Sequence, residues 1–269
     1  MKYSVLFCGF LSLALISCNG KTDGSDTLES ITKSTVDEIV DQNYDLQFKD
    51  IVVSQGLKVD VYRASTSRVE VKAPKSIASQ LIVQTEGDKV MIHCKAGATA
   101  SAMQSAQIKV YLPDIGNLEA TNAAEIHLKD KFVREKILVR AISGAHITGS
   151  LMVENLEIDA GSSAEVDMEI YSDNLKLICS SGSTMKLKGE VTLANVEASS
   201  SATIEGENLS VKELELSAVS AARVVLQNHK RLKATASSGA RVDIKSSQDL
   251  VVEQQDANSG SHITVHKVL

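Results

Sequence analysis

The sequence predicts an all-β protein, a single-stranded parallel β-helix of about eight coils of about 20 residues each, with a β-rich N-terminal cap. Three observations support this fold class. A three-residue motif recurs every 18 to 21 residues, apolar positions alternate with polar ones around each copy, and Val, Ile and Thr are plentiful. Because apolar residues recur at every second position, the pattern predicts β-strands and excludes α-helices.

The recurring motif is a short turn sequence of small residues, usually beginning with Ser. Its copies are Asn122-Ala123-Ala124, Ser143-Gly144-Ala145, Ser162-Ser163-Ala164, Ser181-Gly182-Ser183, Ser200-Ser201-Ala202, Ser220-Ala221-Ala222, Ser238-Gly239-Ala240 and Ser259-Gly260-Ser261. A fixed period with small turn residues is typical of stacked coils, each burying its apolar side chains only against its neighbours.

The residues around the motif fall into columns of similar size and polarity. Only small residues stand two positions before its first residue, namely Ala120, Ala141, Ala160, Cys179, Ala198, Ala218, Ala236 and Ala257, and two positions after it, namely Ala124, Ala145, Ala164, Ser183, Ala202, Ala222, Ala240 and Ser261. Four positions after it come Ile126, Ile147, Val166, Met185, Ile204, Val224, Val242 and Ile263. The position between the last two columns is polar, with Glu125, His146, Glu165, Thr184, Thr203, Arg223, Arg241 and His262.

Successive side chains of a strand point to opposite faces, so these columns predict a narrow core and a polar outer face. Each coil is expected to run as strand, tight corner, strand and return turn. Equal positions of neighbouring coils should lie about 4.8 Å apart.

The N-terminus has the arrangement of a bacterial lipoprotein signal. Lys2 is followed by an apolar run that ends at Leu15-Ile16 and leads directly into Ser17-Cys18. We expect residues 1–17 to be the signal peptide and Cys18 to carry the lipid that anchors the protein to a membrane. An ordinary secretory peptide with a chance cysteine is the alternative.

Three further segments follow. Residues 18–43 are polar and predict a tether, either disordered or with one weak helix. Residues 44–115 predict a β-rich part that caps the first coil, and residues 116–269 predict the β-helix. In the β-rich part, expected strands are Ile51–Val53, Leu57–Tyr62, Val69–Lys72, Leu81–Gln84, Val90–Cys94 and Ile108–Leu112, with a hairpin turn at Glu86-Gly87-Asp88 and a flexible loop over 97–105.

Composition narrows the function classes. The net charge is −6 with scattered acids, which disfavours a nucleic-acid partner. The chain has no Trp, and its few aromatic residues form no column, which disfavours a sugar-binding groove. Neither His127 with His146 nor His262 with His266 has zinc spacing, so no metal or cofactor is expected.

Two cysteines remain outside the N-terminal segments. Cys94 shares the apolar face of a predicted strand and Cys179 stands in a small-residue column, so both are expected in the core. A disulfide between them stays open for an exported protein.

A catalytic centre is not expected. The nearest arrangement to an acid and base pair is a weak candidate surface cluster of His146, Glu165 and Asp167 on neighbouring coils. A solvated strand face is the alternative explanation, and the short coils leave no room for the loops that wall an enzyme's groove.

Two strings resemble a known family. They are Ile51 to Val61 (IVVSQGLKVDV) and Ile108 to Ala120 (IKVYLPDIGNLEA), and Ser-Gly-Ala coils follow them. From about Phe48 to the C-terminus the chain resembles the putative auto-transporter adhesin, head GIN domain family, common in exported proteins and lipoproteins of Bacteroidetes. The resemblance implies a right-handed β-helix, an adhesin role and no catalytic motif. Asn122-Ala123-Ala124 departs from the family's Ser-Gly-Ala at the first coil.

Three hypotheses about function follow. The first is a non-enzymatic outer membrane lipoprotein, presenting its rod at the cell surface to a protein or cell-surface partner. The second is a structural or assembly role on the periplasmic face. The third is a β-helical enzyme acting on polysaccharides, which would need converging carboxylates. The sequence leaves the partner and the oligomeric state open.

Overall fold

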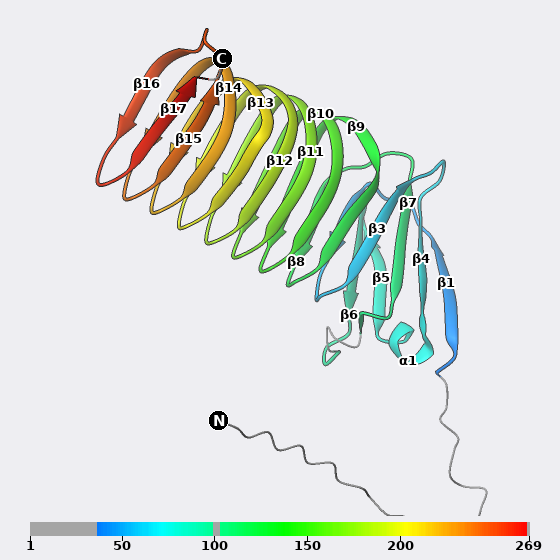
Figure 1. Cartoon of the computed structure of the whole chain (residues 1–269). Coiled ribbons are helices and arrows are strands. Elements are labelled where there is room, and N and C mark those ends of the chain that lie inside the picture. Colours follow the sequence, from blue (N-terminus) through cyan, green and yellow to red (C-terminus); the bar gives the residue numbers. More distant parts are fainter. Residues whose placement is uncertain (1–36, 99–102, 268–269) are drawn as a thin grey trace, which may run out of the picture. The chain divides into compact units, whose positions relative to one another are not determined.

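The computed structural model describes residues 37–98 and 103–267. It is nearly all-β, with 70% strand and 2% helix, and forms a parallel β-solenoid of about eight turns (Figure 1). The predicted fold class is therefore confirmed.

Long strands that each follow most of one coil form the middle of the stack, and shorter strands form the coils at its ends. The strands of the stack are β8 (Leu118–Thr121), β9 (Glu125–Ile142), β10 (His146–Gly161), β11 (Glu165–Cys179), β12 (Thr184–Ala198), β13 (Thr203–Ala218), β14 (Arg223–Ala236), β15 (Arg241–Ser246), β16 (Val251–Ala257) and β17 (His262–Lys267), of which β9 to β14 are the long ones. Neighbours pair in parallel, and equal columns meet, for example Ile147 with Val166 and Ala160 with Cys179. The spacing read from the sequence is thus the register of the stack.

The motif residues form one end of every coil, which we call the serine corner. In all eight copies the first residue has a left-handed backbone, as at Ser162 (φ 53°), and so does the second, as at Ser163 (φ 60°). Two successive left-handed residues reverse the chain tightly, and small or glycine side chains adopt this conformation at least cost. Across the corners, backbone amides make the stacking bonds: the amide of Gly144 donates to the carbonyl oxygen of Ser162 at 3.0 Å.

The predicted columns line the core. Both small-residue columns are buried except at the last coil, where Ala257 is exposed. The bulky column four positions after the motif is buried from Ile126 to Val242, and Ile263 in the last coil is partly buried. The polar column between them faces outward. Volume and alternation together therefore determine which side of each strand enters the core.

The opposite end of the coil differs from the expected return turn. There the strand bends without a break, and β11 continues from Glu165 to Cys179. We call this end the return bend. At its apex two successive residues, Asp173 and Asn174, are exposed, which resets the alternation between the two sides of the coil. Coils of different length are accommodated near it by register shifts, as between Thr148 and Ser150.

The N-terminal part continues the same stack. Its elements are β1 (Ile39–Asp45), β2 (Asp50–Val53), β3 (Lys58–Arg63), β4 (Arg68–Pro74), the short helix α1 (Lys75–Ala78), β5 (Leu81–Glu86), β6 (Lys89–Cys94) and β7 (Gln107–Leu112). The six predicted strand runs are confirmed, and β5 and β6 form the predicted antiparallel hairpin.

Strands β2 and β3 form a further coil that the repeat analysis did not identify. Gln55 (φ 63°) and Gly56 (φ 70°) make its corner, and the amide of Gly56 donates to the carbonyl oxygen of Asn122 at 2.9 Å. This coil lies between β6 with β7 on one side and β8 with β9 on the other. It was missed because the buried Leu57 occupies the position that is Ala or Ser elsewhere.

The tether predicted for residues 18–43 is wrong at its C-terminal end. Residues from Ile39 onward form β1, which pairs antiparallel with β4 over its whole length. The apolar side chains of Val40 and Tyr44 pack against the core, and their period of two belongs to a strand. The segment was predicted to be disordered or to hold one weak helix. Its strand conformation depends on a partner about 30 residues further along the chain, which the local sequence does not reveal.

The signal peptide, Cys18 and the tether up to residue 36 lie outside the described residues, as does the centre of the predicted loop, residues 99–102. Among the residues that the structure describes, no helix is long and apolar enough to cross a membrane.

Candidate functional site

The structure places the predicted cluster on the outer face of the strands that follow the serine corners. His146 on β10 lies opposite Glu165 on β11, and Asp167, two residues further along β11, lies opposite Thr148. All three side chains are at least partly exposed. The predicted proximity along the stack is therefore correct, but the bonds that these groups form differ from those of an acid and base pair.

Glu165 is bonded to a cation of the next coil. The ammonium Nζ of Lys186 lies 2.6 Å from Glu165 Oε1, and this hydrogen bond lowers the pKa of Glu165. A general acid needs a carboxyl whose pKa is raised toward neutrality. The ion pair therefore argues against a catalytic role for Glu165.

A second histidine, His127, lies next to the cluster and has more partners than His146. His127 Nε2 lies 2.9 Å from Glu125 Oε2, and its Nδ1 lies 2.7 Å from the Thr148 hydroxyl oxygen. Its ring meets the ring of His146 edge-on, with 6.1 Å between centroids. His127 stands five positions after the first residue of its motif and His146 stands three positions after its own, so they lie in different columns. The diagonal contact between these columns was not predicted.

The carboxylate of Glu125 also has bonding partners. Its carboxylate bonds Lys58 at 3.0 Å in addition to His127. Burial acts to raise the pKa of Glu125, but the hydrogen bonds from Lys58 and His127 outweigh it and lower that pKa. The described residues contain no group of three His, Cys, Asp or Glu side chains placed to hold a metal ion.

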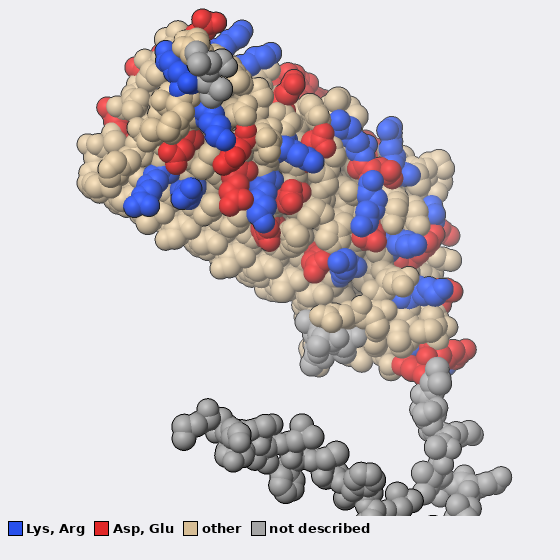
Figure 2. Space-filling model, in the orientation of Figure 1, with Lys and Arg blue, Asp and Glu red and all other residues tan. Residues whose placement is uncertain are grey.

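Ion pairs of this kind recur along the outer faces. Glu157 pairs with Lys176 at 3.0 Å, and Asp159 pairs with Arg140 at 3.2 Å, each joining neighbouring coils. Figure 2 shows blue and red side chains interspersed over one face, while the edge formed by the serine corners is free of both colours. These faces are thus largely charge-compensated.

The open question of a disulfide is answered by the fold. Cys94 on β6 and Cys179 on β11 are both buried and free. Five strand-to-strand steps separate β6 from β11, or about 24 Å at ~4.8 Å per step, far beyond the Cα separation that a disulfide allows. Both side chains belong to the core, as predicted, and burial raises the pKa of both thiols.

Two of the aromatic residues are stacked on each other in the N-terminal part. Tyr62 on β3 and Tyr111 on β7 are stacked, with ring centroids 5.3 Å apart. The guanidinium of Arg68 covers the Tyr111 ring at 3.8 Å. The pair forms because β3 and β7 are neighbouring strands. It could not be read from the sequence, since the two residues are about 50 positions apart.

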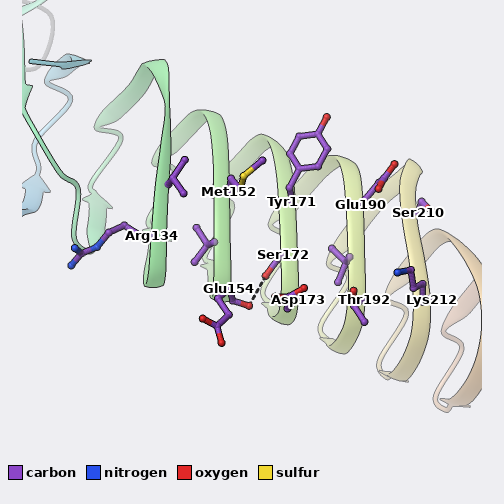
Figure 3. Close-up of a pocket in the computed structure, with 13 residues that line it drawn as sticks. Arg134, Met152, Glu154, Tyr171, Ser172, Asp173, Glu190, Thr192, Ser210 and Lys212 are labelled. Carbon is purple, nitrogen blue, oxygen red and sulfur yellow. Dashed lines mark hydrogen bonds between the residues drawn. The ribbon is translucent and has the colours of Figure 1, made fainter.

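The return bends of β9 to β13 form an open groove of about 400 Å³, which we call the bend groove (Figure 3). It is lined by Val133, Arg134, Met152, Val153, Glu154, Tyr171, Ser172, Asp173, Glu190, Val191, Thr192, Ser210 and Lys212. The groove runs across the strands, from one coil to the next.

The bend groove has two unlike walls. Val133, Met152 and Tyr171 are register partners on successive coils and begin one wall, which continues with Glu190 and Ser210. Glu154, Asp173, Thr192 and Lys212 line the other side (Figure 3). Between them lies a floor that includes the largely buried Val153, Ser172 and Val191.

The apolar wall is exposed to solvent. Val133 is 58% exposed and Met152 is 42% exposed. Tyr171 is fixed in place, since its hydroxyl donates to Glu169 Oε1 at 2.8 Å and the Lys131 ammonium lies 4.1 Å from its ring centroid. The hydrogen bond to Glu169 raises the pKa of Tyr171.

Sequence reasoning missed the bend groove. Met152, Tyr171 and Glu190 each stand nine residues after the first motif residue of their coil, so an exposed column was available at that spacing. Val133 stands eleven residues after Asn122, because the first coil is two residues longer before the bend. The register shift hid the alignment.

The chain resembles known proteins in sequence and in fold. The family model described as putative auto-transporter adhesin, head GIN domain matches residues 47–247. The chain belongs to this family. Its membership confirms the resemblance and supports an adhesin-like role at the cell surface or envelope.

Solved structures share this fold. A putative adhesin from Parabacteroides merdae ATCC 43184 is 15% identical, with a TM-score of 0.74, and the match covers 86% of this chain and 97% of that chain. A putative adhesin from Parabacteroides distasonis ATCC 8503 has the same identity and coverages, with a TM-score of 0.75. A putative lipid binding protein from the same organism also has this identity and these coverages, with a TM-score of 0.72. At such identities the likeness shows the fold alone. None of the curated proteins matches this chain.

Proposed function

We propose that this adhesin-like family member is a non-enzymatic lipoprotein of the outer membrane, anchored through Cys18 and presenting its solenoid to a partner at the cell surface. The family match supports the adhesin-like part of the proposal. The lipoprotein-type arrangement around Ser17-Cys18 supports the anchor.

One observation carries the contact role over an enzymatic one. The carboxylate of the candidate cluster is held in an ion pair with Lys186, whereas the bend groove exposes Val133 and Met152 to water. Exposed apolar side chains rimmed by polar ones are typical of contact surfaces. Acid and base catalysis instead needs groups with matched pKa values that face a common substrate.

The location is tested by adding a protease to intact and to lysed cells and following the solenoid with an antibody. Digestion in intact cells is the expected result, because a surface-displayed body is accessible from outside. Protection until lysis would contradict surface display and favour the periplasmic structural role.

The anchor is tested by fractionating cells that produce the Cys18→Ala variant. The variant should leave the membrane fraction after a carbonate wash, because it lacks the thiol that would carry the lipid. Wild-type protein is the matched control. A variant that stays with the membranes would show that the lipid is not the anchor.

A further inference from the structure

The bend groove differs from the flat faces in its charge balance. On the flat faces, carboxylates such as Glu157 and Glu165 bond cations of the next coil. In the groove, Glu154, Asp173 and Glu190 form no ion pair with any described residue, and Lys212 is the one lining cation of which the same is true. The other lining cation, Arg134, is bonded to Asp114. The groove therefore carries an uncompensated negative charge.

The groove also exposes apolar side chains. Six large apolar residues are exposed among those that the structure describes, and two of them, Val133 and Met152, line the groove. A third, Leu193, lies in the return bend of β12 beside the lining residues. Burying such side chains against a partner lowers the free energy in proportion to the apolar area removed from water. Tyr171 adds a ring that is already fixed by Glu169 and Lys131, so little conformational entropy is lost when a ligand packs against it.

The two walls match the side-chain pattern of an extended peptide. Successive side chains of an extended chain point to opposite sides. In the groove, one side would meet Met152 and Tyr171, and the other would meet Glu154 and Asp173 (Figure 3). A segment that alternates apolar with basic residues complements both walls over β9 to β11, and its remainder crosses the polar positions of β12 and β13, where Glu190 offers a further carboxylate.

The dimensions limit the length of the segment. The groove crosses five strands, β9 to β13, which is four steps of ~4.8 Å or about 19 Å. An extended chain rises about 3.3 Å per residue, so about six residues fill the groove.

We propose that the bend groove binds an extended polypeptide segment of about six residues in which basic and apolar side chains alternate. The inference rests on the proposed function, because it gives the contact protein its contact site and names the chemistry of its partner. The basic side chains would pair with Glu154 and Asp173, and the apolar ones would cover Val133, Met152 and the Tyr171 ring.

The test measures fluorescence anisotropy of a labelled six-residue peptide alternating lysine with leucine, titrated with the purified full chain. Saturable binding is expected, together with much weaker binding of a peptide alternating glutamate with leucine and of one alternating lysine with serine. Equal binding of all three peptides, or binding of none, would overturn the proposal.

Variants assign the binding to the groove. The double variant Glu154→Gln, Asp173→Asn should weaken binding about tenfold, because two exposed charge pairs are lost. Glu197→Gln with Glu215→Gln is the matched control, since it removes two exposed carboxylates of β12 and β13 that do not line the groove, and it should leave binding within about twofold. An equal loss in both double variants would mean that only net charge matters and would overturn the proposed site.

A measurement on the wild-type protein guards against misfolded variants. Raising the salt concentration should weaken binding of the lysine and leucine peptide, because salt screens exposed charge pairs. Binding that does not depend on salt would contradict the role of Glu154 and Asp173. The peptide experiment uses purified protein, so surface display and peptide binding can fail independently of each other.

Discussion

The serine corner and the return bend close the same coils in different ways. At the corner, left-handed residues and small buried neighbours recur from Asn122 to Ser259 with little variation. At the bend, the strand continues through, register shifts absorb differences in length, and the exposed side chains range from Val133 to Asp173. The repeated corner maintains the stack, while the varied bend carries the proposed binding groove.

This contrast has a physical basis. A corner residue with positive φ must be small or pay a backbone cost, and a side chain in the narrow core has no free volume. A bend residue such as Asn174 or Leu193 faces water and meets neither limit. The molecule can therefore change its bends without changing its fold.

The largest effect is expected for Ala164→Leu at the corner. Ala164 is buried in the small-residue column, so the larger side chain should lower the free energy of unfolding by about 1–3 kcal/mol. Urea unfolding of the purified protein measures this change.

Two controls sharpen the comparison. Ala164→Ser introduces the residue that already occupies this column at Ser183 and should cost less than Ala164→Leu. Asn174→Leu introduces at the bend the residue that stands at the same register position in the next coil, Leu193, and should change the free energy of unfolding by no more than about 0.5 kcal/mol. A bend variant as damaging as Ala164→Leu would contradict the distinction.

A smaller effect is expected for Ser163→Val. Ser163 has φ 60°, where a β-branched side chain is strained, so the free energy of unfolding should fall by about 1–2 kcal/mol. Ser163→Gly is the matched variant, since Gly stands at this position at Gly144 and Gly182, and it should stay within about 1 kcal/mol of wild type. Equal stability of the Val and Gly variants would show that the left-handed corner is not a constraint.

The smallest effect concerns the ion pairs of the flat faces. Because the bond to Lys186 lowers the pKa of Glu165 in the folded state, its contribution is present above the unfolded pKa of about 4.3 and is lost as the pH falls through the lower folded value. Wild type should therefore lose more stability than Glu165→Gln when the pH falls from about 6 to about 3, by less than about 1 kcal/mol. Urea unfolding at both pH values tests this, and identical losses would mean that the pair contributes nothing.

The sequence predicted the features that depend on local alternation and volume. Ala164 and Val166 could be assigned to the core because each stands in a column of like residues, and the turn at Ser162 and Ser163 followed from the same alignment. Strand β1 could not be predicted in the same way, since its pairing with β4 depends on residues about 30 positions away.

The candidate site was predicted only in part. The neighbouring positions of His146 and Glu165 followed from the period, but the bond from Lys186 to Glu165 depends on how far a flexible side chain reaches. The bend groove was missed because the alignment of Val133 with Met152 depends on a register shift in the backbone pairing of β9 and β10. Periodicity describes the average coil, and the proposed binding groove lies where coils depart from it.

The position of β2 and β3 has a consequence for the order of assembly. These strands precede in the chain all four strands that flank them in the stack, β6 and β7 on one side and β8 and β9 on the other. Residues 50–63 therefore gain both flanking layers only after the chain as far as Leu128 is available, whereas each later coil can add to the one before it as it is made. Since long-range pairing slows folding, the cap is expected to close more slowly than the coils beyond it elongate.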